Sequence, residues 1–167
     1  MALENFNYAV PWSKFKKVSR DPSGENMDAE TVTEYQANNM KIAKQGNAVV
    51  YVSVSVKIFV NSQESWALTG HTNAELLKHE QGHYDISALA ARTFYNSVLK
   101  LSAPDLNALD LASKKLNAEM KTKIEDVNKR YDIQTSHSRN KTAQNKWNKA
   151  IEMEKKSNYG CIDNLPL

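Results

Sequence analysis

Residues 49–60, VVYVSVSVKIFV, constrain the fold more than any other part of this chain. Every even-numbered position from Val50 to Val60 is apolar, whereas the odd positions include two serines and a lysine. This repeat of two predicts a long β-strand with one buried face. The preceding residues 30–43, ETVTEYQANNMKIA, predict a second strand, and the turn KQGNA joins the two strands as a hairpin.

Beyond about residue 70 the pattern changes from strand to helix. Thr72 and Glu75 have the spacing of a capping box, which predicts that a first helix begins there. A second helix is expected from after Ser102 to about Arg130, because apolar residues recur there every three or four positions. A third is expected over residues 138–156. The polar segment YDIQTSH, residues 131–137, separates the last two helices.

These patterns predict an α+β fold in which an N-terminal antiparallel β-sheet precedes three main helices. The 167 residues, of which 41% are hydrophobic and 25% charged, suit one domain that buries its own core. We expect that domain to span residues 1–167, with a strand-rich part over 1–66, a helical part over 72–157 and a tail over 158–167. No run of 18 apolar residues is present, so no membrane span is expected.

Charge, cysteine content and the first residues limit the classes of partner and compartment that can be expected. The net charge is only +3, and the basic residues are interspersed with acidic ones, so nucleic acid is not an expected partner. Cys161 is the single cysteine, which excludes an intramolecular disulfide. The first residues, MALENFNYAV, lack the basic and apolar regions of a signal peptide. Nothing in the sequence indicates an oligomeric state.

The segment LLKHEQGHYDI places two histidines four positions apart on the first helix. His79 and His83 are then separated by about 40° around the helix and about 6 Å along it, so two imidazoles can bind one metal ion. Glu80 flanks the same face and suits the role of general base toward a metal-bound water. Zinc fits this donor set because it accepts imidazole nitrogen and tolerates an open position. The alternative is two unrelated histidines on a partly wet helix surface.

A catalytic zinc needs a third protein ligand, and His137 is the best candidate. It lies in the polar segment between helices, where Asp132 could orient its ring by accepting from the free N–H and Tyr131 could donate to an oxyanion. The ordinary alternatives are a turn-forming Asp132, a core Tyr131 and a His137 that merely precedes a helix. Less suitable residues are Asp85 on the opposite helix face, His71 before the cap and Glu119 among lysines.

These motifs resemble a bacterial family of unknown function whose members are described as predicted secreted or periplasmic zinc-dependent proteases. The matching positions are Trp12, Phe15, His79, Glu80, His83, Tyr131, Asp132, Thr135, His137, Gln144 and Trp147. Ser138 stands where the family usually has glycine. The resemblance implies that His137 is the third ligand of one Zn²⁺ per chain, and that the protein is secreted or periplasmic.

We therefore expect a zincin-like metallopeptidase that hydrolyses a peptide or protein substrate through a zinc-bound water, with Glu80 as general base. The hairpin is expected to offer an edge strand to an extended substrate, unless the strand over residues 49–60 is central. Two alternatives remain. One is a non-catalytic binding module that contains zinc, against which the presence of Glu80 argues. The other is a zinc amidohydrolase that acts on a non-peptide amide.

Overall fold

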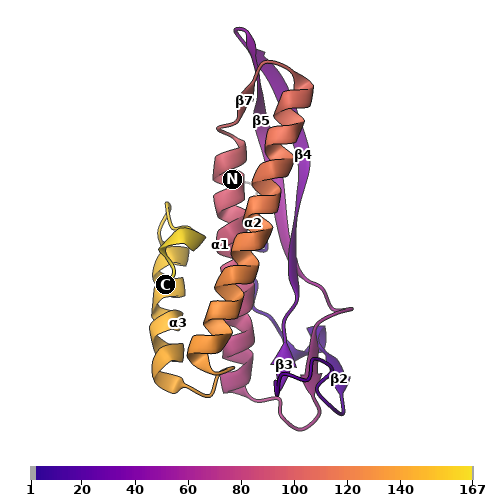
Figure 1. The fold of residues 1–167 in the computed structure, drawn as a ribbon, viewed down its shortest axis with the longest axis vertical. Coiled ribbons are helices and arrows are strands. Elements are labelled where there is room, and N and C mark those ends of the chain that lie inside the picture. Colours follow the sequence, from indigo (N-terminus) through magenta and orange to yellow (C-terminus); the bar gives the residue numbers. More distant parts are fainter. Residues whose placement is uncertain (1–2, 167) are drawn as a thin grey trace.

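The structure, a computed structural model, describes residues 3–166 and consists of three helices beside a long β-hairpin (Figure 1). The helices are α1 (Ala74–Val98), α2 (Leu106–Thr135) and α3 (Lys141–Lys156). The hairpin consists of β4 (Thr33–Gln45) and β5 (Ala48–Val60). The short strands are β1 (Leu3–Glu4), β2 (Lys16–Val18), β3 (Ala29–Glu30), β6 (Trp66–Leu68) and β7 (Ser102–Ala103). The 3-10 turns are η1 (Trp12–Lys14) and η2 (Ile162–Asn164).

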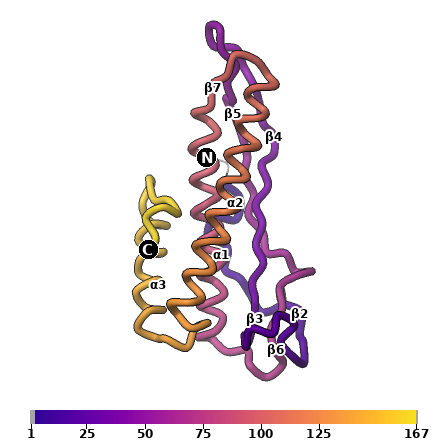
Figure 2. Tube along the Cα trace, in the orientation of Figure 1, coloured from indigo at the N-terminus to yellow at the C-terminus, as the bar shows by residue number. Residues whose placement is uncertain are grey.

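The strands form two sheets. In the larger sheet β5 is central: β4 pairs with one edge in antiparallel fashion, while β1 and β7 pair with the other. In the smaller sheet β6 lies between β2 and β3. This sheet lies at the end of the molecule opposite the hairpin tip (Figure 2). The α+β class is confirmed, but the single antiparallel sheet was wrong, because β1 and β2 pair in parallel with β5 and β6.

The hairpin is confirmed, but one of the side chains expected to be buried is exposed. Val54, Val56 and Ile58 are buried as expected, but Val52 is 51% exposed. The cause is an irregularity in the pairing with β4, where the register shifts on both sides of Lys41. Such a shift moves the following side chains to the opposite face of the sheet. The position of β5 also settles that an open edge of the hairpin belongs to β4 rather than to β5.

Helix α1 lies at the centre of the fold and is buried over most of its length. One apolar cluster joins it to the hairpin through Ala88 and Val56, and a second joins it to α2 and α3 through Leu89 and Trp147. The helix begins one residue later than expected, because the side chain of Asn73 accepts the hydrogen bond from the backbone N–H of Leu76. Asn73, not Thr72, is therefore the N-cap.

Helix α2 is longer than expected and continues through Thr135. The change of direction comes only at Ser136, His137 and Ser138, which all have positive φ angles of 49°, 50° and 75°. Asn140 then caps α3 by accepting from the backbone N–H of Ala143. The predicted polar break over residues 131–137 is thus mostly the last helical turn of α2, and the true turn is short.

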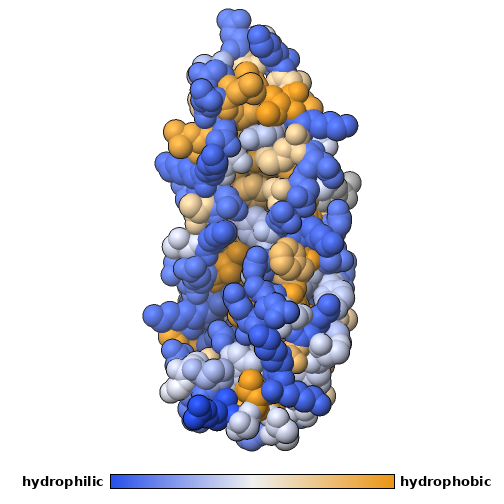
Figure 3. Space-filling model, turned by 90° about the vertical axis from the view of Figure 1, so that its right-hand side faces the viewer, coloured by the Kyte–Doolittle hydropathy of each residue, from blue (hydrophilic) through white to orange (hydrophobic). Residues whose placement is uncertain are grey.

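The surface gives two further observations. No helix within residues 3–166 is long and apolar enough to cross a membrane. On the face drawn in Figure 3, hydrophobic atoms gather toward the hairpin end, whereas the other half is mainly hydrophilic with isolated hydrophobic spots.

Candidate metal centre

Helix α1 brings His79 and His83 together as their spacing predicts. Their Nε2 atoms are 3.3 Å apart, and their ring centroids are separated by 4.9 Å at an interplanar angle of 89°. Both residues are buried, and His79 is only 2% exposed. Two imidazole nitrogens therefore point toward one small volume that bulk water barely reaches.

Helix α2 adds a carboxylate to this pair. Oδ1 of Asp132 lies 3.0 Å from Nε2 of His79 and 3.0 Å from Nε2 of His83. Nitrogen and oxygen ligands bind a tetrahedral zinc at about 2.0–2.2 Å, so two such ligand atoms are roughly 3.3 Å apart. The three atoms thus have the mutual separations of zinc ligands, and they form the group that could hold a metal ion.

The outer nitrogens of the two rings also favour a cation here. Nδ1 of His79 lies 2.9 Å from Oε1 of Gln144, and Nδ1 of His83 lies 3.0 Å from Oδ1 of Asn128. When each Nδ1–H donates to its amide oxygen, each Nε2 presents a lone pair toward the Asp132 carboxylate. Three electron-rich atoms then converge, and a positive charge between them removes their repulsion.

The pKa values of His83 and Asp132 also show that this site favours a positive charge. Burial by itself lowers the pKa of His83, but the Asp132 carboxylate, together with Glu80, outweighs burial and raises that pKa to about 9. Burial by itself raises the pKa of Asp132, but His83 and His79 hold it well below its usual range. A metal ion would take the place of the proton that the pair otherwise holds.

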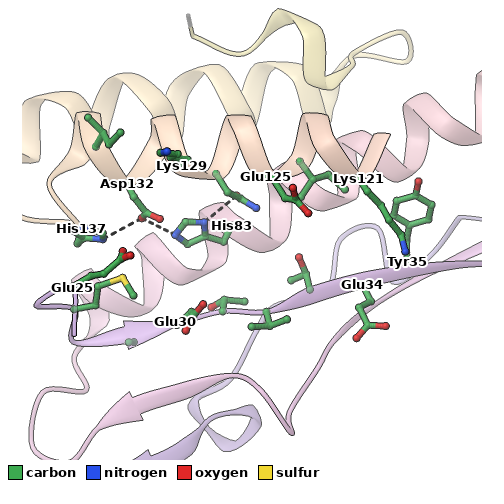
Figure 4. A pocket seen from close by; sticks show the side chains of 18 residues that line it. Glu25, Glu30, Glu34, Tyr35, His83, Lys121, Glu125, Lys129, Asp132 and His137 are labelled. Atoms are coloured by element: carbon green, nitrogen blue, oxygen red, sulfur yellow. Dashed lines mark hydrogen bonds and ion pairs between the residues drawn. The ribbon is translucent and has the colours of Figure 1, made fainter. Parts of the chain in front are cut away.

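His137 lies at the rim of this group rather than within it. Its Nδ1 is 3.5 Å from Oδ1 of Asp132, and its side chain is 26% exposed. Its role as a zinc ligand stays a prediction. Asp132 does not have the position expected of a residue that orients His137 from behind, because it stands between His137 and His83 (Figure 4) and also contacts His79. The structure makes Asp132 a candidate ligand in its own right.

Glu80 lies next to the histidines and is held from the strand side. Its Oε2 accepts a hydrogen bond of 2.6 Å from the hydroxyl of Thr31, which lies between β3 and β4. Glu80 as a whole is 1% exposed, and its carboxylate is close enough to His83 to contribute to the raised pKa of His83. Thr31 therefore restricts the rotamers of Glu80 and keeps its carboxylate beside the candidate metal site.

Tyr131 does not have the position of an oxyanion donor. It is fully buried, its ring stacks on His79 with centroids 4.6 Å apart, and its hydroxyl donates to the backbone carbonyl of His79 at 3.2 Å. A Cβ added to Gly82 would lie 2.3 Å from the same hydroxyl, so the tight packing requires glycine there. The alternative of a core tyrosine fits, and burial raises its pKa above the usual range.

A groove of about 730 Å³ opens beside the site. One wall is formed by residues 29–35, the other by α2 from Lys121 to Ile133, and His83 and Asp132 lie along it. His137, Asp132 and His83 gather at one end of this groove, with Glu30 and Glu34 on the strand side (Figure 4). The polar group that could bind a metal is thus reachable from an elongated cleft.

The residues set aside on sequence grounds lie elsewhere. Asp85 pairs with Lys155 at 2.5 Å. His71 is exposed and its Nδ1 lies 2.7 Å from Asp28. Glu119 is exposed, with its carboxylate 4.0 Å from Lys115. None of them belongs to the group of described residues that could hold a metal ion.

Three residues that contact the site were given no role by sequence reasoning. Asn128 is one polar residue among many on α2 and gives no distinct signal, and Thr31 is remote in the chain, so only the tertiary structure reveals them. Gln144 did carry a signal, because it is a polar residue on the buried stripe of α3 beside Trp147. A glutamine in such a stripe needs a partner, and the structure supplies His79.

Fold and site together define an α+β protein with a candidate His-His-Asp metal centre at one end of a groove. The chain belongs to the bacterial proteins of unknown function designated DUF922, whose family model matches residues 15–138. No curated protein and no solved structure matches it. The expected bacterial family of unknown function is therefore confirmed, while its protease label and the zincin-like fold stay predictions. The matched range includes His79, His83 and His137 but not Gln144.

Proposed function

We propose that this protein is a zinc-dependent hydrolase of peptide bonds. His79, His83 and Asp132 hold the metal, and Glu80 is the general base. The observation that carries the proposal is the set of three converging donor atoms, together with a Glu80 carboxylate that is held by Thr31 and is close enough to His83 to raise its pKa. When bound, zinc supplies a Lewis acid that polarises a carbonyl and lowers the pKa of water.

Glu80 is prepared to accept a proton. Thr31 donates to Oε2, so Oε1 is the atom that takes the proton of an attacking water. The site is buried, which strengthens electrostatic interactions between charged groups and the reacting atoms. Tyr131 supports the site from behind by stacking on His79 rather than by contacting the substrate.

The groove suits an extended polypeptide. β4 pairs only with β5 among the described strands, so the backbone groups on the outer edge of β4 have no strand partner. A peptide can add to such an edge through main-chain hydrogen bonds, while its side chains contact the facing wall of α2. A substrate bound in this way would pass the end of the groove where His83 and Asp132 lie.

A non-catalytic zinc module is the second candidate, and the position of His137 favours it. With its Nδ1 3.5 Å from Asp132, a small movement would make His137 a fourth protein ligand. Zinc sites with four protein ligands are normally structural, because no position remains for water or substrate.

The test combines zinc content with hydrolysis of a fluorescently labelled, unfolded casein. We expect about one zinc per chain in the wild type and in Glu80→Gln. Hydrolysis should fall about 100-fold or more in Glu80→Gln, because the general base is lost while the ligands remain. Glu119→Gln, an exposed change on α2, is the matched control and should keep wild-type hydrolysis.

Two outcomes would reject the peptidase. If zinc-loaded wild type cleaves neither casein nor a mixed peptide library, the structural module is favoured. If His83→Ala retains full zinc content, the metal lies elsewhere and the proposed centre is wrong.

A further inference from the structure

His79 is tied to α3 by a connected set of buried hydrogen bonds. Oε1 of Gln144 lies 2.9 Å from Nδ1 of His79. Nε2 of Gln144 donates to the hydroxyl of Tyr131 at 2.5 Å and to Oδ1 of Asn148 at 2.9 Å. The hydroxyl of Tyr131 closes the set by donating to the backbone carbonyl of His79. Gln144 itself is 8% exposed, so water hardly competes for these groups.

The carbonyl of His79 indicates which group donates and which accepts in each hydrogen bond of this set. The carbonyl of His79 can only accept, so the Tyr131 hydroxyl donates to it and has only acceptor capacity left for Gln144. The amide nitrogen of Gln144 must then face Tyr131, and its oxygen must face the ring of His79. In the neutral ring of His79, Nδ1 therefore carries the proton, and Nε2 keeps the lone pair that a metal needs.

The reverse orientation of Gln144 would have the opposite effect. Its amide nitrogen would donate to Nδ1 of His79, the ring proton would move to Nε2, and that nitrogen could not bind a metal. Asn148 follows the same direction, because its Oδ1 accepts from Gln144, while its own buried Nδ2 has no hydrogen-bond partner in the described part of the chain.

We infer that Gln144 is a positioning residue that holds His79 in its metal-binding tautomer, with Tyr131 setting the orientation of the Gln144 amide. Helix α3 is thus part of the metal centre although it supplies no ligand. The inference rests on the proposed metal site, but not on any hydrolytic activity. Outer partners of metal-bound histidines generally contribute about 10- to 100-fold to metal affinity.

The experiment measures zinc affinity by competition with a chromophoric chelator for three variants. Gln144→Met keeps the length of the side chain but removes the acceptor, and should weaken zinc binding about 10- to 100-fold. Gln144→Glu keeps an acceptor for Nδ1–H, and its other oxygen accepts the Tyr131 proton when that hydroxyl gives up its bond to the carbonyl of His79. It should bind zinc at least as tightly as the wild type. Tyr131→Phe should weaken binding less than Gln144→Met does.

Matched controls separate positioning from a general loss of packing. Gln81→Met makes the same substitution on α1, where Gln81 bonds Val10, Tyr8 and Asp85 instead of a histidine. Tyr84→Phe removes an equally buried hydroxyl that donates to Asn5. Both should leave zinc affinity within about threefold of the wild type, since neither touches His79.

A second readout needs no zinc. ¹⁵N NMR of the metal-free protein reports which ring nitrogen of His79 carries the proton, and Nδ1 protonation is expected in the wild type but not in Gln144→Met. The inference is overturned if wild-type His79 is protonated at Nε2 alone. It is also overturned if folded Gln144→Met binds zinc as tightly as the wild type, or if Gln144→Glu and Gln144→Met are weakened equally. A wild type that binds zinc without hydrolysing casein rejects only the peptidase.

Discussion

Adjacent residues on a helix point about 100° apart, and this separation decides the different positions of Tyr131 and Asp132. We expected both residues in a loop, where neighbouring side chains can face the same site. Because α2 continues through Thr135, Asp132 faces the two histidines while Tyr131 packs in the core behind them. The same rule explains why His79 and His83 were placed correctly, since residues four apart share a helix face.

The competing roles of Asp132 and His137 can be separated by zinc affinity. Asp132→Asn should weaken zinc binding by about 100-fold or more, because a ligand charge between two histidines is lost. His137→Ala should weaken zinc binding by about tenfold or less, because the ring of His137 lies at the rim of the candidate site. Chelator competition measures both. Asp126→Asn, an exposed change on the same helix, should have no effect, and a larger loss in His137→Ala would restore His137 as the third ligand.

At the scale of elements, the turn between α2 and α3 carries backbone strain next to the candidate metal centre. Ser136, His137 and Ser138 are all left-handed, a conformation that disfavours residues with a Cβ. This explains why a glycine after the histidine suits the family that the sequence resembles. In the last turn of α2, Thr135 donates its hydroxyl to the carbonyl of Tyr131 at 2.7 Å. The turn is therefore short and held on both sides by helix caps.

Replacing Ser138 by glycine should relieve part of this strain. We expect Ser138→Gly to increase the free energy of unfolding by about 1 kcal/mol, because glycine adopts a φ of 75° without a steric penalty. Urea unfolding of the metal-free protein measures the change. Ser157→Gly is the control, since Ser157 has a φ of −73° and glycine gains nothing there. A destabilised Ser138→Gly variant would mean that the serine side chain is needed in the turn.

At the scale of the whole molecule, the candidate site joins parts that are far apart in the sequence. His79 and His83 come from α1, Asp132 from α2, and Thr31 from the segment between the two sheets. The groove is likewise shared between strand residues and α2. A metal at this point links α1 to α2 and should stabilise the packing of the whole helical layer.

Zinc should therefore raise the thermal stability of the protein. At a free zinc concentration of about 100 times Kd, binding to the native state alone contributes about 2.7 kcal/mol. For a chain of this size we expect the Tm to rise by about 5–10 °C. Differential scanning calorimetry with zinc and with a chelator measures the shift. Glu80→Gln should keep it and His83→Ala should lose it, whereas an equal shift in His83→Ala would indicate zinc binding at another place.

Local periodicity in the sequence was enough to predict the hairpin, the three helices and the pairing of His79 with His83. Those features depend on residues close together in the chain, and an alternating strand or a helix face repeats with a fixed period. The exposure of Val52, the parallel pairing of β1 and the end of α2 depended on contacts with other elements. The tertiary structure alone decided that Asp132 stands among the histidines, that Thr31 holds Glu80 and that Gln144 reaches His79. Each of these contacts joins residues at least 49 positions apart, and no periodic pattern encodes such a separation.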